Sequence, residues 1–505
     1  MSFEKKMKRK GRALISAYVD SPYSNVGEKA RKPFPLWAKI SIPSALGSAA
    51  IAAIVLALSI ASFTPRGDLL GQHALLRPEK PFNSEHVELS LDYRGSIGLF
   101  ANEAFKRKAR SAKQSQQMTV NVRNEAGEDA SQIDEINFVL APFSYANTLY
   151  MLYDGSAGET KDALKQALHL DETSFDHRRE AKNAIHNAAI DEVDSKNRRT
   201  YSDVSQALFV DDSIVSSLKQ EYLDGVAEAY YASAFRGDLK SHEMLDVMNA
   251  YRAEKTQTTS GEVSHAMLDD LSSMAGGSLG TETMWLFNTS CVISEWGEET
   301  VLGLEADFEN YDGSKTSGVR YFQMKRVCEL LEGEQYYLAT FPLQKELNFH
   351  VLLPKEGTDY SSVMEENADA LFSLSAPLNY MANVSLTLPE FDISTTLSSL
   401  SDILAADSHL QTSETAQSYP GIVSSAAGNK FSIASFACSE IQVKSTGITA
   451  SSAISGGYLF PLSGEWEGPR VHLRADHPFL FALTNSDGLP LYAGQLAKIN
   501  QKDGI

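Results

Sequence analysis

The most constraining feature of this sequence is an unbroken alternation of helical and strand-like segments from Ile136 to the C-terminal region. Helices are indicated by apolar residues three and four apart, and strands by short apolar or β-branched runs between turn formers. No linker or internal repeat interrupts this alternation, and 43% of the 505 residues are hydrophobic. The pattern predicts one large α/β domain. The predicted helices are Ser96–Ala112, Tyr145–Tyr153, Thr160–Leu168, Ser217–Tyr231 and Met244–Lys255, and the predicted strands are Val204–Val210, Met284–Ser294, Glu334–Phe341, Leu347–Leu353, Val384–Leu388, Phe431–Val443 and Pro478–Leu483.

The net charge of −20 is distributed unevenly. Residues 1–39 carry ten Lys and Arg against three acidic residues, so this segment is +7 and the remainder of the chain is −27. Affinity for nucleic acids comes mainly from neutralising phosphates with basic side chains. An acidic main domain therefore argues against a nucleic-acid partner.

Residues 40–63 form an uncharged run of 24 residues, dense in Ile, Ala, Leu and Val. A helix of roughly 20 apolar residues crosses the hydrocarbon core of a membrane. The alternatives are a cleaved signal peptide, whose apolar region is usually shorter, and a buried globular helix. Basic residues ahead of the run favour a cytoplasmic location for residues 1–39. We expect a single-pass anchor in the cell membrane over 40–63, a polar tether over 64–90 and an extracellular domain over 91–500.

The three cysteines, Cys291, Cys328 and Cys438, are few and odd in number. An exported domain stabilised by disulfides usually has more cysteines, in even number. We interpret these three residues as small buried hydrophobic side chains.

One motif in the sequence is typical of an enzyme. Gly276-Gly-Ser278-Leu-Gly280 fits the pattern of a hydrolase nucleophile turn. That turn requires a strand before the serine and a helix after it, whereas here a helix-like run precedes and a strand-like run follows. We interpret the motif as a Gly-rich turn. Because no metal-ligand spacing and no phosphate-binding glycine loop occur either, we expect no enzyme activity, catalytic residue, metal or cofactor.

Several segments resemble the serpin family of serine protease inhibitors, in the family's order and spacing. The C-terminal run Arg474–Phe481 followed by Leu491–Leu496 is the most specific of them, and the resemblance covers about residues 91–498. It implies an α/β fold with a large central β-sheet, further sheets, surrounding helices and an exposed reactive loop. The other matching segments are Asn137–Ser144 with Leu149, Gly155 and Thr160; Asn249 with Lys255-Thr256 and Gly261–Val263; Asn288 with Trp296; Phe341-Pro342; Leu352–Lys355; and Val384–Phe391.

The composition and periodicity of Gly447–Ile454 favour such a loop independently of the family resemblance. Its residues Gly447, Ile448, Thr449, Ala450, Ser451, Ser452, Ala453 and Ile454 are small or β-branched and uncharged. With a side-chain period of two, Ile448, Ala450, Ser452 and Ile454 share one face, as in a strand buried on that face. The stretch 455–470 that follows reads as an exposed loop. An ordinary strand followed by an ordinary surface loop explains the same pattern.

The resemblance implies a mechanism in which the loop imitates a substrate. The protease forms its acyl-enzyme on the cleaved loop, and Gly447–Ile454 acts as the hinge of a segment that inserts into the central sheet. The family's usual spacing from Gly447 ends at Pro461, which few serine proteases accept before the cut. We therefore predict Leu462–Ser463 as the reactive bond, with Phe460–Pro461 as the second choice. An apolar bait residue predicts a chymotrypsin-like or elastase-like partner, and we expect a monomer.

The sequence departs from the family pattern at the positions that control sheet opening. The resemblance assigns Ser144, Asn288 and Trp296 to that region, but Ala141 and Ala437 stand where the family has polar partners. Glu390 and Ser445 replace a usual Lys and acid together, and Ile448 and Ile454 replace hinge Thr or Ser. Because interacting polar residues are replaced together, no buried polar group is left without a hydrogen-bond partner. These departures keep open a non-inhibitory serpin that acts as a surface binding module.

Overall fold

The computed structural model describes residues 68–119, 136–170, 175–195, 198–256, 283–296, 300–373, 380–397, 403–404, 418–425, 431, 433–450 and 468–499. Leu69–Ile505 forms one compact unit, distinct from Met1–Asp68. The helices are α3 (Leu69–His73), α4 (Leu91–Thr119), α5 (Pro142–Gly155), α6 (Gly158–Ala167), α7 (His177–Ala188), α8 (Gln220–Tyr230), α9 (His242–Thr256) and α11 (Tyr360–Asn367), with 3-10 turns at Val215–Ser217, Gln344–Glu346 and Ala368–Leu371.

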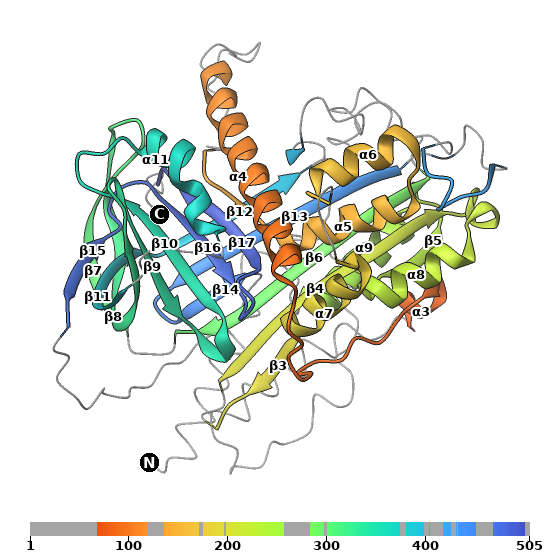
Figure 1. Cartoon of the computed structure of the whole chain (residues 1–505), viewed down its shortest axis with the longest axis horizontal. Helices are drawn as coiled ribbons and strands as arrows, with labels where there is room; N and C mark the ends of the chain where they lie inside the picture. The colour runs from red at the N-terminus through yellow and green to blue at the C-terminus, as the bar shows by residue number, and fades with distance from the viewer. Residues whose placement is uncertain are drawn as a thin grey trace, which may run out of the picture. The chain divides into compact units, whose positions relative to one another are not determined.

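Two sheets organise the described residues (Figure 1). The central sheet has the strand order β1-β5-β4-β6-β14-β13-β12, with β3 paired to β4. The second sheet has the order β15-β11-β8-β9-β10-β16-β17-β2, with β7 paired to β8. The central-sheet strands are β1 (Ala74–Leu76), β3 (Ile190–Val193), β4 (Arg199–Asp211), β5 (Ser233–Gly237), β6 (Met284–Glu295), β12 (Phe391–Leu397), β13 (Ile433–Lys444) and β14 (Gly447–Ala450), and the second-sheet strands are β2 (Phe138–Leu140), β7 (Thr300–Glu309), β8 (Lys315–Glu332), β9 (Tyr336–Pro342), β10 (Asn348–Pro354), β11 (Tyr380–Pro389), β15 (Arg470–Arg474), β16 (Phe479–Thr484) and β17 (Pro490–Leu496).

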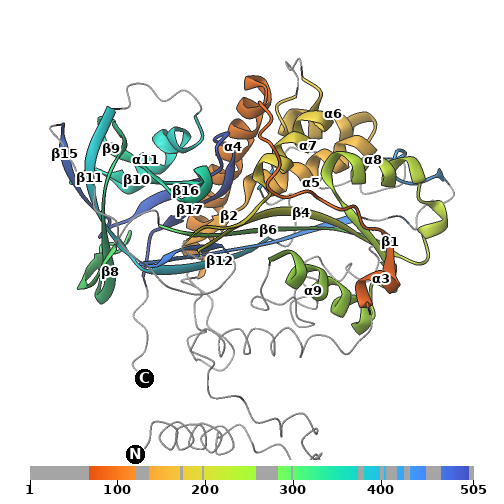
Figure 2. The same ribbon diagram turned by 90° about the horizontal axis from the view of Figure 1, so that it is seen from below.

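Helices cover both faces of the central sheet. Figure 2 shows α5, α6, α7 and α8 on one face, with α9 on the other. The face under α9 has its own apolar cluster, in which Phe209 and Phe235 of the sheet pack with Met244 and Met248 of α9. Strand β4 is therefore buried on both faces, since Leu208 and Val210 belong to the main core. This arrangement agrees with the α/β fold expected from the sequence.

Two boundaries expected from the sequence are wrong. Helix α4 extends to Thr119, seven residues beyond the end expected at Ala112. Polar residues such as Lys and Gln are good helix formers, and polarity alone did not mark the end of the helix. Residues 69–90 are not a simple tether, because they pack along the domain and contribute α3 and β1. Residues 64–67, the apolar run 40–63 and residues 1–39 lie outside the described part.

Candidate functional site

The candidate site is a slot in the central sheet, occupied at one end by β14. Gly447–Ala450 pairs antiparallel with Glu295–Val292 of β6, and Gly447–Thr449 pairs antiparallel with Lys444–Gln442 of β13. Further along the sheet, β6 and β13 pair directly and in parallel, from Met284↔Ile433 to Asn288↔Ala437. At one end of the slot β14 therefore separates β6 from β13, and at the other end these two strands pair directly. We call these the open end and the closed end.

Close packing at the mouth of the slot requires a glycine. A Cβ atom on Gly447 would lie 2.5 Å from the carbonyl oxygen of Ser294 and 2.8 Å from the Cα of Glu295. Real Cβ atoms do not approach backbone atoms so closely, so Gly447 lets β14 sit against β6. The next side chain, Ile448, is 0% exposed within the main core. The β-branched residue that departs from the family pattern thus fits the buried face of the sheet.

The turn between β13 and β14 is held by three side chains from outside it. Glu390 Oε1 accepts hydrogen bonds from the backbone N–H of Ser445 at 3.1 Å and from its hydroxyl at 2.9 Å. The indole N–H of Trp296 donates to the carbonyl of Lys444 at 2.7 Å, and Thr300 Oγ1 donates to the carbonyl of Ser445 at 2.6 Å. Although Glu390 and Ser445 both depart from the family pattern, they remain partners. No sequence pattern predicted the hydrogen bond from Thr300 to this turn.

Replacing Glu390 with leucine should loosen this turn. Hydrogen bonds to a charged group contribute roughly 1.5–3 kcal/mol each when buried, and Glu390 is only partly buried. We expect the free energy of unfolding, measured by denaturant titration, to fall by about 1–3 kcal/mol. The matched control is Glu309→Gln, whose exposed side chain pairs with Lys315 at 3.8 Å and should leave the value nearly unchanged. Equal values for both variants would contradict the anchoring role of Glu390.

A buried polar cluster lies at the closed end of the slot. The hydroxyl of Ser144 donates to Asn288 Oδ1 at 3.4 Å. Gln206 Nε2 donates to the carbonyl of Ser144 at 3.3 Å, and Thr148 Oγ1 donates to Gln206 Oε1 at 2.8 Å. Ser144 and Asn288, which the resemblance assigned to one region, are therefore in contact. Gln206, which comes from the neighbouring strand β4, was not predicted to join them.

Trp296 does not join that cluster. It follows the end of β6, eight residues beyond Asn288, and a strand of that length spans about 26 Å. Its ring packs on Phe322 and Phe349 of the second sheet, with centroids 5.8 and 5.6 Å away. The grouping of Trp296 with Ser144 and Asn288 is corrected accordingly: Trp296 holds the hinge turn at the open end of the slot.

The remaining predicted site residues lie outside the described part of the chain. They are Ser451, Ser452, Ala453 and Ile454 of the hinge, and Phe460, Pro461, Leu462 and Ser463 of the reactive loop. The Gly276–Gly280 motif lies outside it as well. In the described residues, no helix is both long and apolar enough to span a membrane, and no group of three or more His, Cys, Asp and Glu is arranged to hold a metal ion. Cys291 and Cys328 are buried, and the thiol of Cys291 donates to the carbonyl of Thr256 at 3.2 Å.

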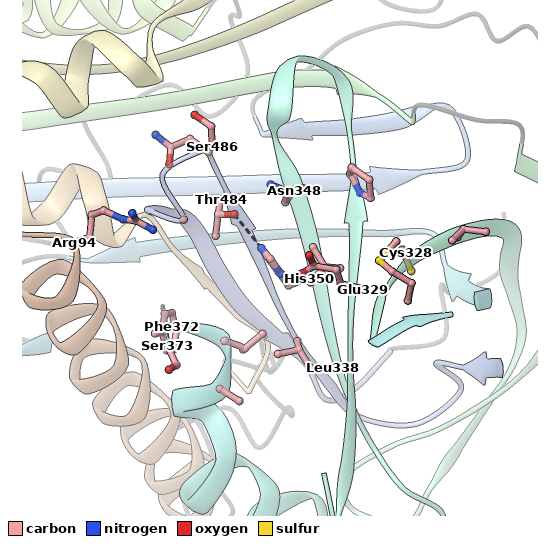
Figure 3. Close-up of a pocket in the computed structure, with 18 residues that line it drawn as sticks. Arg94, Cys328, Glu329, Leu338, Asn348, His350, Phe372, Ser373, Thr484 and Ser486 are labelled. Carbon is pink, nitrogen blue, oxygen red and sulfur yellow. Dashed lines mark hydrogen bonds between the residues drawn. The ribbon is translucent and has the colours of Figure 1, made fainter. Parts of the chain in front are cut away.

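A second feature is a cavity of about 450 Å³ beside the second sheet, shown in Figure 3. Arg94 of α4, Phe372 near α11 and residues of β8, β9, β10 and β16 line it. His350 lies in its wall, with Nδ1 3.0 Å from Thr340 Oγ1 and Nε2 2.9 Å from Thr484 Oγ1. Burial lowers the pKa of His350 to about 4, so the ring is neutral at pH 7.

The lowered pKa of His350 predicts a loss of stability in acid. Between about pH 6.5 and pH 4 the unfolded chain binds a proton at this histidine and the folded protein does not, so stability falls as the pH falls. The loss is at most about 1.4 kcal/mol per pH unit in this window. Denaturant titrations of the wild type and of His350→Gln should show a shallower pH dependence for the variant. Identical slopes would contradict the assignment.

Comparison with solved structures identifies the fold. Tengpin, a thermophilic serpin solved in its native state, superposes with a TM-score of 0.61 at 15% identity, over 85% of this chain and 99% of that one. Serpin48 of the insect Tenebrio molitor gives 0.60 at 19%, over 82% and 100%. Thyroxine-binding globulin, solved in complex with thyroxine, gives 0.55 at 14%, over 80% and 98%. At these identities the likeness shows a shared fold.

The sequence itself shows the family. Residues 113–499 match the sequence profile of the serpins, described as serine protease inhibitors. No curated protein matches the chain. The chain belongs to the serpin family. Members of this family are generally protease inhibitors rather than catalytic enzymes.

Proposed function

We propose that this protein inhibits a serine protease as a suicide substrate. The observation that carries the proposal is the position of β14, which lies between β6 and β13 while these two strands still pair beyond it. Because β14 already occupies one end of the slot between β6 and β13, the residues that follow it can extend the same strand. Because the inserted strand gains ladder hydrogen bonds on both sides, insertion after cleavage is favourable.

Continuing the register of β14 indicates how far insertion proceeds before the sheet must open. With Gly447 opposite Glu295, Ile454 falls opposite Asn288, and the pairing of Thr449 with Gln442 places Ile454 opposite Ala437. Asn288 and Ala437 are the last directly paired residues of the closed end. Ile454 is thus the first hinge residue that must separate β6 from β13. The small Ala437 leaves room for the larger apolar side chain.

The chemical step belongs to the protease. Its serine oxygen attacks the carbonyl carbon of Leu462, the amide bond to Ser463 breaks, and the protonated amine of Ser463 leaves with the C-terminal fragment. The new ester joins Leu462 to the enzyme. Insertion of the hinge segment then carries the enzyme along and distorts its active site before water can hydrolyse the ester. The inhibitor supplies the scissile bond and the sheet into which the cleaved loop inserts.

The test is incubation with chymotrypsin, an elastase and trypsin, followed by denaturing electrophoresis and mass spectrometry of the small C-terminal fragment. We expect a covalent complex with chymotrypsin or elastase and a fragment that begins at Ser463. A fragment beginning at Val471, from a trypsin cut after Arg470, would contradict the assigned bond. Clean cleavage by every enzyme without any complex would contradict inhibition.

The second candidate function is a non-inhibitory binding module. The cavity beside His350 favours it, since a space of about 450 Å³ lined by apolar and polar side chains suits a small amphipathic ligand. The structurally similar thyroxine-binding globulin was solved with a small molecule, thyroxine. The protease incubation separates the two functions, because a binding module would be cleaved without forming a complex.

We further propose that residues 40–63 anchor the protein in the cell membrane with the serpin domain outside the cytoplasm. The support is the uncharged run behind a segment of charge +7. Membrane fractionation should keep the full-length chain with the membrane after a high-salt wash. Release of a soluble species that begins near residue 64 would show a cleaved signal peptide instead.

A further inference from the structure

Residues 69–87, here called the N-terminal strap, run along the domain ahead of α4 (Figure 1). The first part of the strap joins the edge of the central sheet. Leu70 of α3 packs into the apolar cluster under α9, and β1 pairs with β5 through Ala74↔Phe235 and Leu76↔Ala234. Arg77 donates to both carboxylate oxygens of Glu254 on α9, at 3.0 and 2.8 Å. The strap thus begins on the β5 side of the sheet.

The middle of the strap has a buried ion pair with β4. The ammonium of Lys80 contacts the carboxylate of Asp203, and it donates to the carbonyl of Val204 at 2.8 Å and to Ser205 Oγ at 3.0 Å. The side chains of Lys80 and Asp203 are 5% and 2% exposed. The ring of Phe82 stacks on Tyr201, with centroids 5.8 Å apart. Because buried charges are costly to separate, this ion pair holds the middle of the strap to β4.

The attachment lies beside the end of the slot. Asp203, Val204 and Ser205 pair with Cys291, Ser290 and Thr289 of β6, immediately beyond Asn288, where β6 leaves its direct pairing with β13. Strand β4 is bonded to β6 along its length. When β6 moves away from β13, β4 must move with it, together with the residues that hold Lys80.

The end of the strap is attached to the other side of the slot. His86 Nε2 lies 2.9 Å from Asp487 Oδ1, in the turn between β16 and β17 of the second sheet. Asn187 bonds both Val87 and Asp487, with donor–acceptor distances of 2.7 and 3.0 Å.

The second sheet is in turn bonded to the β12–β13 side of the central sheet. Strand β17 pairs with β2, and the N–H of Val139 in β2 donates to Thr395 Oγ1 of β12 at 2.8 Å. The turn that holds the end of the strap therefore belongs with the strands across the slot from β6.

We infer that the N-terminal strap is a clamp across the slot, which resists sheet opening and so sets the rate of loop insertion. Inserting one strand separates β6 from β13 by about 4.8 Å more than their direct pairing allows. The strap is fixed to β4 at Lys80 and to the second sheet at His86, only six residues later, so one of these attachments must give way. This inference rests on the proposed insertion mechanism.

The test measures insertion without a protease. Full-length protein in detergent is mixed with a fluorescent peptide that has the sequence Thr449–Phe460, and peptide annealing is followed by native electrophoresis. The first variant combines Lys80→Met with Asp203→Asn, which removes the ion pair without leaving one buried charge. The second is His86→Ala, which removes a half-exposed side chain. Arg236→Gln is the control, because the exposed side chain of Arg236 in β5 pairs with Asp212, which lies outside the strap.

We expect annealing to be about tenfold faster in the double variant and about threefold faster in His86→Ala, with the control at the wild-type rate. Equal annealing rates in all four proteins would overturn the clamp and leave the slot intact. If neither the wild type nor any variant annealed the peptide, insertion itself would be contradicted and the clamp with it.

Discussion

Replacing Gly447 with alanine should convert the protein from an inhibitor into a substrate. The added Cβ would meet the backbone of Ser294 and Glu295 at 2.5 and 2.8 Å, and backbone atoms cannot yield as a flexible side chain can. Overpacking of this kind costs roughly 1–3 kcal/mol. The clash would displace β14 from its pairing with β6, so the residues that follow it would enter the slot more slowly, and the protease would complete hydrolysis first.

The measurement is the ratio of covalent complex to cleaved protein after reaction with the susceptible protease. We expect this ratio to fall by about tenfold or more in Gly447→Ala. Gly95→Ala is the matched control, since the same added atom on helix α4 would meet nothing within 4 Å. An unchanged ratio for Gly447→Ala would show that the position of β14 in the slot does not control insertion of the residues that follow it.

Ser452→Asp should abolish complex formation, whereas Ser451→Asp should weaken it far less. Ile448 is fully buried in the sheet, and a period of two places Ser452 on the same face after insertion and Ser451 on the opposite face. Burying an unpaired carboxylate costs several kcal/mol, which corresponds to a more than about 100-fold loss of insertion. The two variants carry the same substitution at adjacent serines, so charge and loop composition are matched.

Complex formation by the two variants is compared on denaturing gels with the same protease. Equal loss in both would mean that the added charge acts by disturbing protease recognition and not by its position in the sheet. Undiminished complex with Ser452→Asp would contradict insertion of this segment.

The fold class could be predicted because its signals are local. Periodicity located parts of β4, β6, β10, β13 and β16 and of α5, α6, α8 and α9. The strands were predicted too short where buried polar residues break the apolar pattern, as Ser202 and Asp203 do in β4. Helix α7 was missed because its exposed face is dominated by charged residues, such as Arg178 and Arg179. The hairpin of β7 and β8 was missed because its alternation is irregular.

The site was predicted only in part, because its contacts join residues far apart in the chain. Strand β14 could be predicted from small, uncharged residues with a period of two. The bonds that hold it come from Glu390, Trp296 and Thr300, and no local pattern marks such partners. The N-terminal strap looked like a tether because it is polar and contains Pro78 and Pro81. Its polar groups are satisfied by partners more than 100 residues away, such as Asp203 and Asp191.

When the reactive loop is cut, its hinge segment should become a strand of the central sheet. The most direct measurement is the thermal unfolding midpoint of the full-length protein before and after cleavage at Leu462–Ser463 by a catalytic amount of protease. Insertion would add a fully hydrogen-bonded strand between β6 and β13, so we expect Tm to rise by more than about 10 °C. A Tm that is unchanged or lower after cleavage would show a clipped surface loop and would contradict loop insertion.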